Sequence, residues 1–156
     1  MKKIYVLILS LLCLVSFSAC GSVDTASMNF ESVVTEMTEL MYSGDYDAAA
    51  EYISESAPKD LDASALEEIA VGTQDAYGSY VGISSLERTS INEFITIMEL
   101  TDKVNPEGYN AIVYFMVVAF EQSEMGFFIM LDPDDRGIVN ITVVGLEARP
   151  AETIEE

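Results

Sequence analysis

The chain contains no histidine and no tryptophan, and only two of its 156 residues are cysteines, Cys13 and Cys20. Both cysteines lie within the first twenty residues, so the rest of the chain has no thiol for a disulfide, a nucleophile or a metal ligand. Zinc sites are usually built from cysteine and histidine, and Ser-His-Asp triads and Cys-His dyads need an imidazole. The sequence therefore excludes these common metal and catalytic centres, and it predicts no cofactor.

Basic residues are also scarce, because seven lysines and arginines stand against 27 aspartates and glutamates, for a formal net charge of −20. Binding to nucleic acid, or to anionic lipid through the domain surface, requires a basic face, so neither partner is expected. The acidic residues are spread along the whole chain, which is typical of an evenly solvated surface. Capture of a cationic peptide or of Ca2+ is the functional alternative.

The one long apolar run lies at the N-terminus. Lys2 and Lys3 precede an apolar segment from Ile4 to about Phe17, and small residues then lead into Cys20. This is the layout of an export signal. The run is shorter than the roughly 20 residues that a membrane-spanning helix needs. Its ending, Phe-Ser-Ala-Cys, resembles the lipobox of bacterial lipoproteins, in which the cysteine is lipidated and becomes the new N-terminus.

We therefore expect a signal peptide over 1–19 and a tether over 20–27 that is anchored at Cys20 by acyl chains such as palmitate. The membrane would be a partner through this lipid anchor, and the domain would face the extracytoplasmic side of the cell membrane. Plain secretion after cleavage and a retained membrane helix are the alternatives to this interpretation.

Helical periodicity characterises the first half of the remaining chain. Gly44 is a natural stop for the first helix, Asp45 is a suitable N-cap for the second, and Ser64-Ala65-Leu66-Glu67 fits a capping box at the start of the third. The predicted helices are Met28 to Tyr42, Tyr46 to about Ile53, and Asp62 or Ser64 to about Tyr77.

Strand-forming residues dominate the second half. The predicted strands are Tyr80 to Ser90, Phe94 to Leu100, Asn110 to Glu121, Met125 to Leu131 and Ile138 to Val144. Helices followed by an antiparallel meander predict a single α+β domain over 28–146, with two to three N-terminal helices packed on a curved antiparallel sheet of four to five strands. An acidic tail over 147–156 is expected to be disordered.

The strand over 111–120 is apolar on both of its faces, whereas a half-exposed sheet should alternate apolar and polar residues. Ala111, Val113 and Phe115 belong to one face, and Ile112 and Tyr114 belong to the other. One face is expected to lie under the helices. The other face must be covered by a pocket with its ligand, by a dimer partner, or by side chains of the same chain.

Three segments carry a resemblance to a known family. They are Tyr42-Ser43-Gly44-Asp45-Tyr46-Asp47-Ala48-Ala49, the aliphatic strand Ala111–Phe120, and the turn Leu131-Asp132-Pro133-Asp134-Asp135-Arg136-Gly137-Ile138. The chain from Phe30 to Val144 resembles small uncharacterised lipoprotein domains of Gram-positive bacteria. That resemblance implies the cone-shaped fold shared by nuclear transport factor 2 and the cystatins, and it implies no activity. The segment from Gly82 to Lys103 is longer than the family pattern.

The first functional hypothesis is a non-catalytic binding module for a small apolar ligand or a peptide. Pocket sites combine apolar walls with a few polar anchors. The candidate pocket residues are Tyr77, Tyr80, Tyr114, Met116, Phe128 and Met130, with Asn140 and Thr142 as polar anchors. Ordinary core packing is the alternative explanation of the aromatic and methionine residues.

Two further hypotheses remain. A homodimer could form through the open sheet face, because an excess of apolar surface favours such contacts. An enzyme would need a buried carboxylate as its base, for which Glu87, Glu93 and Glu99 are candidates, although catalysis is not expected. Asp132-Pro133-Asp134-Asp135 could chelate Ca2+, yet it lacks the ligand spacing of an EF-hand loop and a hairpin turn explains it better.

Overall fold

The computed structural model of the protein describes residues 24–98 and 110–146. The leader, Cys20 and the predicted acidic tail lie outside these residues. The elements are η1 (Thr25–Ser27), α2 (Phe30–Ser43), α3 (Tyr46–Ala50), α4 (Ala63–Tyr77), β1 (Tyr80–Thr89), α5 (Ile91–Ile97), β2 (Ile112–Phe120), β3 (Glu124–Leu131) and β4 (Ile138–Val144). The predicted α+β class is confirmed, with three helices preceding an open four-stranded antiparallel sheet.

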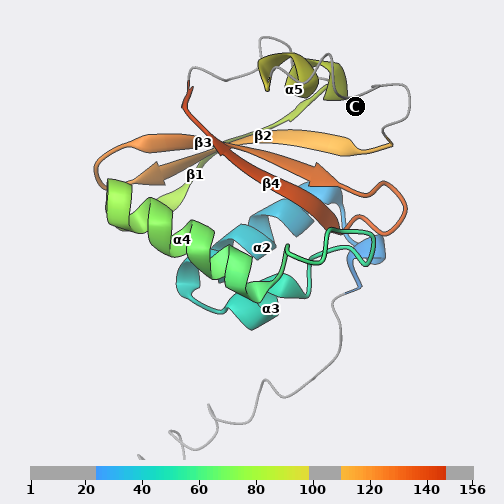
Figure 1. Ribbon diagram of the computed structural model, residues 1–156, viewed down its shortest axis with the longest axis horizontal. Coiled ribbons are helices and arrows are strands. Elements are labelled where there is room, and N and C mark those ends of the chain that lie inside the picture. Colours follow the sequence, from blue (N-terminus) through green and yellow to red (C-terminus); the bar gives the residue numbers. More distant parts are fainter. Residues whose placement is uncertain (1–23, 99–109, 147–156) are drawn as a thin grey trace, which may run out of the picture.

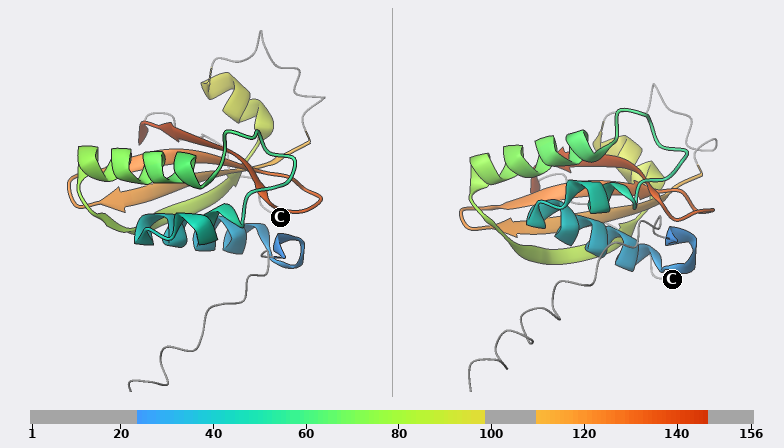
Figure 2. Two further views of the ribbon diagram at one scale, coloured as in Figure 1. Left: turned by 60° about the horizontal axis from the view of Figure 1, so that its bottom comes forward. Right: turned by 90° about the horizontal axis from the view of Figure 1, so that it is seen from below.

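The sheet is a simple meander in the order β1-β2-β3-β4, and each pair of neighbours is antiparallel. Helices α2, α3 and α4 form a layer on one face, while α5 lies on the opposite face (Figure 1). The sheet is twisted, and β1 curves alongside α2 (Figure 2). None of the helices in residues 24–98 and 110–146 has both the length and the apolar content needed to cross a membrane.

The ends of α2 and α3 follow from their capping residues. Asn29 accepts a hydrogen bond from Ser32 N at 2.7 Å, and Gly44 closes α2 in the left-handed conformation with a φ of 87°. The side chain of Asp45 then accepts a hydrogen bond from Ala48 N at 3.3 Å. Gly44 as the helix stop and Asp45 as the N-cap are therefore confirmed. Helix α3 is shorter than expected and ends at Ala50.

The capping box expected at Ser64 is wrong. Asp62 is the N-cap of α4, because its carboxylate accepts hydrogen bonds from Ser64 N at 2.9 Å and Ala65 N at 3.1 Å. Ser64 therefore lies inside the first turn. Because the Asp62 carboxylate already accepts hydrogen bonds from the free N–H groups of the first turn, α4 begins directly after Asp62, the earlier of the two predicted positions.

The predicted strand over 94–100 is also wrong where the structure describes it, because Ile91–Ile97 forms helix α5. The side chain of Ser90 caps this helix by accepting a hydrogen bond from Glu93 N at 3.1 Å. Phe94 and Ile95 are buried against the sheet. Isoleucine-rich sequence favours strands in general, but the cap and the burial of one helical face decide the conformation here.

Two separate cores cover the two faces of the sheet. The larger core joins α2, α3 and α4 to Tyr114, Met116, Val118 and their neighbours on β3 and β4. The smaller core joins α5 to a set of strand residues, namely Val113, Phe115, Val117, Phe128 and Met130. Val113 to Val118 are all buried, so both faces of β2 are covered over the middle of the strand, as its apolar residues predict.

The beginning of the described chain is fastened to the turn between β3 and β4. The hydroxyl of Thr25 donates a hydrogen bond to the backbone oxygen of Asp135 at 2.7 Å. The guanidinium of Arg136 donates to the backbone oxygen of Met28 and lies 5.1 Å from the centre of the Phe30 ring. Residues more than 100 positions apart therefore meet at this end of the sheet.

Candidate functional site

A cavity of about 570 Å³ lies between α5, β4 and the loop that joins α3 to α4. Small-molecule sites in proteins have about 300–1,000 Å³, so this cavity has the volume of a ligand pocket. Eleven residues line the pocket: Ser56, Pro58, Phe94, Met98, Asn110, Ala111, Met130, Asp132, Val139, Asn140 and Thr142. It lies on the sheet face that the sequence leaves without a predicted cover.

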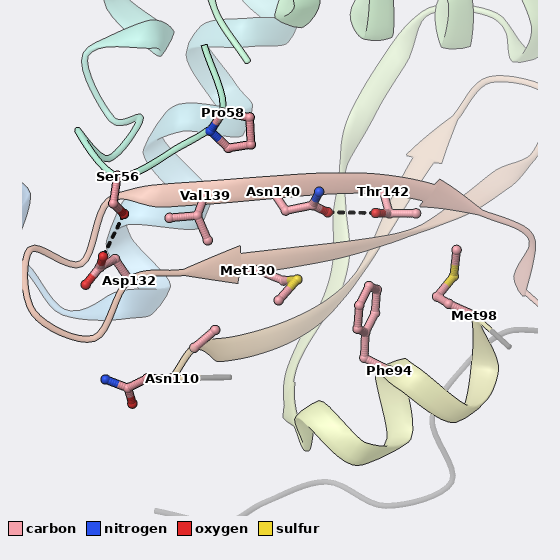
Figure 3. A pocket seen from close by; sticks show the side chains of 11 residues that line it. Ser56, Pro58, Phe94, Met98, Asn110, Met130, Asp132, Val139, Asn140 and Thr142 are labelled. Carbon is pink, nitrogen blue, oxygen red and sulfur yellow. Dashed lines mark hydrogen bonds between the residues drawn. The ribbon is translucent and has the colours of Figure 1, made fainter. Parts of the chain in front are cut away.

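The two ends of the pocket differ in polarity (Figure 3). Ser56 and Asp132 lie at one end, where the β3–β4 turn meets the loop after α3. Phe94 and Met98 of α5 lie at the other end. The ring of Phe94 meets the ring of Phe128 edge to face, with 5.1 Å between the ring centres. Phe128 is fully buried, so its ring gives Phe94 a fixed packing partner in the core next to the pocket.

A polar pair lies along β4 between these ends. The hydroxyl of Thr142 donates a hydrogen bond to Asn140 Oδ1 at 2.7 Å. Since this bond uses the amide oxygen, the carboxamide retains two N–H groups that can donate to a ligand. The pocket therefore has the composition of a typical binding site, with apolar walls and a small number of polar groups.

The acidic end of the pocket is held rigidly. Asp132 Oδ2 accepts a hydrogen bond from Ser56 Oγ at 2.7 Å, and Asp132 Oδ1 accepts one from Asp134 N at 2.8 Å. The Ser56 hydroxyl is the largest cause of a lowered pKa for Asp132, and the backbone N–H of Asp134 adds to it. Hydrogen bonds to a carboxylate favour its charged form. Asp132 is therefore a fixed negative charge at neutral pH.

The Asp132–Gly137 segment forms a hairpin turn between β3 and β4. Asp132 N donates to Gly137 O at 2.9 Å, and Arg136 N donates to Asp132 O at 2.9 Å. The carboxylate of Asp135 is occupied by Ser54 Oγ at 2.8 Å and by Gly137 N at 2.7 Å. In the part of the chain that the structure describes, no group of three or more acidic residues is placed to hold a metal ion.

The eight predicted pocket residues divide between the two faces of the sheet. Met130, Asn140 and Thr142 line the pocket, and Phe128 lies buried beneath it. The other four belong to the helix side, namely Tyr77, Tyr80, Tyr114 and Met116. The structure thus brings half of the set together and leaves the other half on the opposite face.

The four residues on the helix side mainly fill the larger core. Met116 is fully buried, and Tyr77 lies near Phe120 with 6.2 Å between the ring centres. Tyr80 stacks on Tyr42 with 4.5 Å between the ring centres and an interplanar angle of 6°. Tyr114 lines a second, smaller cavity of about 330 Å³ beside Arg136 at the start of α2.

Two of the three carboxylates considered for catalysis, Glu87 and Glu93, are not among the described residues that line the pocket. Glu87 lies on β1 opposite Phe115, and Glu93 lies in the first turn of α5. Both are partly buried, and both have interaction partners. Glu99 lies outside the described residues.

Sequence reasoning missed most of the pocket wall. The sequence predicts a strand over Phe94 to Leu100, which includes Phe94 and Met98. It indicates no role for three other pocket residues, Ser56, Pro58 and Asn110. A signal for α5 is present in the sequence, since Ser90 followed three residues later by Glu93 has the spacing of a capping box. No comparable signal marks Ser56, because its place beside Asp132 depends on chain segments 76 residues apart.

Comparisons of this chain with protein-family models, with curated protein sequences and with solved structures found no match. The fold class is therefore assigned from the structure alone, and the function is argued from the pocket.

Proposed function

We propose that the protein is a lipid-anchored, extracytoplasmic binding module that holds a small, largely apolar ligand in the pocket between α5 and β4. The location rests on the sequence of the leader, where Lys2 and Lys3, an apolar run and Cys20 form a lipoprotein signal. The binding role rests on the pocket. Membership of the cystatin-like and nuclear-transport-factor-2-like cone folds is part of this proposal, and it is supported by three helices preceding a curved antiparallel meander.

The observation that carries the binding role is that the described residues cover the second sheet face only in part. Helix α5 is only seven residues long, and it buries Val113, Phe115 and Phe128 but leaves a cavity over β4. The hollow over β4 has a volume and a mixed apolar and polar lining that are typical of a small-molecule site. A pocket of about 570 Å³ with apolar walls and an amide–hydroxyl pair therefore favours a ligand.

Methionine methyl groups provide a direct test of this proposal. Met98 and Met130 line the pocket, whereas Met37 and Met41 are buried in the core under the helices. We expect 2-phenylethanol, titrated into the full chain in phosphatidylcholine nanodiscs, to cause saturable NMR shifts of the Met98 and Met130 methyl signals. The Met37 and Met41 signals should stay in place, because no route joins the two cores through the packed sheet.

Two alanines give a matched pair of variants for this titration. Ala111 lines the pocket, and Ala119 lies toward the other end of β2 on the same sheet face; both are partly exposed. Ala111→Phe should fill part of the cavity and weaken binding about fivefold or more, and Ala119→Phe should bind like the parent chain. The binding role fails if no saturable shift occurs, or if Ala111→Phe binds as well as the parent.

The alternative proposal, a homodimer through the same sheet face, would use the surface that α5 and the pocket occupy. Val81 on β1 is an exposed apolar side chain of the sheet, whereas the exposed Val143 on β4 pairs with Phe127 and therefore belongs to the helix side. Sedimentation of the full chain in nanodiscs, at one chain per disc and at higher loading, would reveal a dimer as a species of twice the protein mass. A single-chain species at all loadings would remove this alternative.

A further inference from the structure

Within residues 24–98 and 110–146, the side chains that line the pocket place a charge at one of its ends, the end formed by Asp132. Among the described residues that line it, Asp132 is the single ionisable side chain, and the opposite end is formed by the ring of Phe94 and the thioether of Met98. Amide and hydroxyl groups of Asn140 and Thr142 lie between them. A ligand that complements this arrangement must carry a positive group and an apolar group on one molecule.

Asp132 is prepared to receive such a group. Its carboxylate is oriented by Ser56 Oγ and by the backbone N–H of Asp134, so little ordering is needed when a ligand arrives. A carboxylate can accept about four hydrogen bonds, and these contacts leave acceptor capacity on its oxygens. Asp132 is also partly exposed, which keeps its charge solvated while the pocket is empty.

The charge of the whole chain acts in the same direction. A formal net charge of −20 produces a negative potential that attracts cations and repels anions. No lysine or arginine is among the described residues of the pocket wall, so nothing there compensates Asp132 directly. An anionic ligand such as a fatty acid would bring a second negative charge to this end, which is unfavourable.

We propose that the ligand is a primary ammonium compound with an aryl or alkyl group, that its ammonium group binds Asp132, and that its apolar group lies against Phe94 and Met98. This inference rests on the proposed binding function and adds the chemical class of the ligand. Ammonium–carboxylate hydrogen bonds are charge-assisted and are stronger than neutral ones. The amide and hydroxyl groups of β4 would then contact the middle of the bound molecule.

Two probes of nearly the same shape test the charge. Phenethylamine is protonated at neutral pH, and 2-phenylethanol is its neutral counterpart. Both are titrated into the full chain in phosphatidylcholine nanodiscs, and binding is read from the Met98 and Met130 methyl signals. We expect the amine to bind about fivefold to tenfold more tightly than the alcohol, because a partly exposed ion pair contributes modestly. Raising the salt concentration should reduce this ratio.

Two neighbouring aspartates provide the matched variants. Asp132→Asn keeps an acceptor for the turn but removes the charge, and it should bring the amine-to-alcohol ratio close to one. Asp134→Asn removes an equal charge from the same turn, and Asp134 is exposed and does not line the pocket. It should leave the ratio near its parental value.

The possible failures are distinguishable. If neither probe shifts the Met98 and Met130 signals, the binding function itself is refuted. If both probes bind equally well to the parent chain, the pocket binds ligands but the ammonium assignment is overturned, whatever the variants do. A loss of the ratio in Asp134→Asn as large as in Asp132→Asn would also overturn it, because the effect would then belong to the charge of the whole turn.

Discussion

Gly137 is the position where a single methyl group should disturb the fold most clearly. It follows the β3–β4 turn, and a Cβ placed there would lie 2.6 Å from Ser54 Cα and 2.7 Å from Ser54 N. These are backbone atoms of the segment that pairs with the start of β4. Ile138 N donates to Tyr52 O at 2.9 Å, and Ser54 N donates to Ile138 O at 2.9 Å. The segment can retreat from a methyl group only by stretching these two hydrogen bonds.

The expected loss follows from those contacts. Overpacking by one methyl group costs about 1–3 kcal/mol, and a backbone hydrogen bond contributes about 0.5–1.5 kcal/mol net. If the segment of Ser54 moves away from the new methyl group, the overpacking is relieved but the two backbone hydrogen bonds of Ile138 weaken. We therefore expect Gly137→Ala to lower the free energy of unfolding by about 2–3 kcal/mol. Urea unfolding followed by circular dichroism, with the parent and the variant treated identically, measures this change. Since Ser56 belongs to the same loop, the pocket signal of Met130 should shift as well.

Gly72 is the matched control for this substitution. It lies in the exposed part of α4, and a Cβ there would have no atom within 4 Å. Gly72→Ala should therefore stabilise the protein by about 0.4–1 kcal/mol through the lower entropy of its unfolded chain. The packing argument is refuted if Gly137→Ala unfolds within about 0.5 kcal/mol of the parent protein.

Two further predictions concern pH and the leader. Burial raises the pKa of Tyr42 to about 12, and burial together with the Glu36 hydrogen bond raises that of Tyr52 to about 12. Unfolded tyrosine ionises near pH 10, so the stability that depends on neutral Tyr42 and Tyr52 is complete below about pH 10 and is lost as the pH rises toward 12. We therefore expect the urea midpoint of unfolding to decrease from pH 10 to pH 12, and a midpoint that stays constant over this range would contradict the prediction. In a bacterial host fed a labelled fatty acid, Cys20→Ala should abolish labelling of the protein, and Cys13→Ala should preserve it. Label retained by Cys20→Ala would refute the anchor.

The elements with local signals were predicted well from the sequence. The stop at Gly44 and the cap at Asp45 depend on residues adjacent to them, and both were found. The strand over 138–144 has its predicted bounds because a turn precedes it and apolar residues alternate within it. The doubly apolar character of β2 correctly indicated two buried faces.

The errors arise where burial at a distance decides the outcome. Phe94 and Ile95 have strand propensity, but the cap at Ser90 and the open apolar face of β2 and β3 make this segment a helix. The alternation of residues predicts which side chains of a strand share a face of the sheet. It does not predict which of those side chains border a cavity. Met116 and Met130 look alike in the sequence, yet one is sealed beneath helices and the other lines the pocket.

The hydrogen bond from Thr25 to the backbone oxygen of Asp135 would orient the domain relative to the membrane if Cys20 carries the proposed lipid anchor. Four residues lie between Cys20 and Thr25, and the five residue-to-residue steps from Cys20 to Thr25 can extend over at most about 18 Å. A lipid anchor at Cys20 would hold the β3–β4 turn on the membrane-proximal side. Asp132 belongs to the same turn, so the acidic end of the pocket would be the end nearer the leaflet, where an amphiphilic cation leaving the headgroups would arrive first.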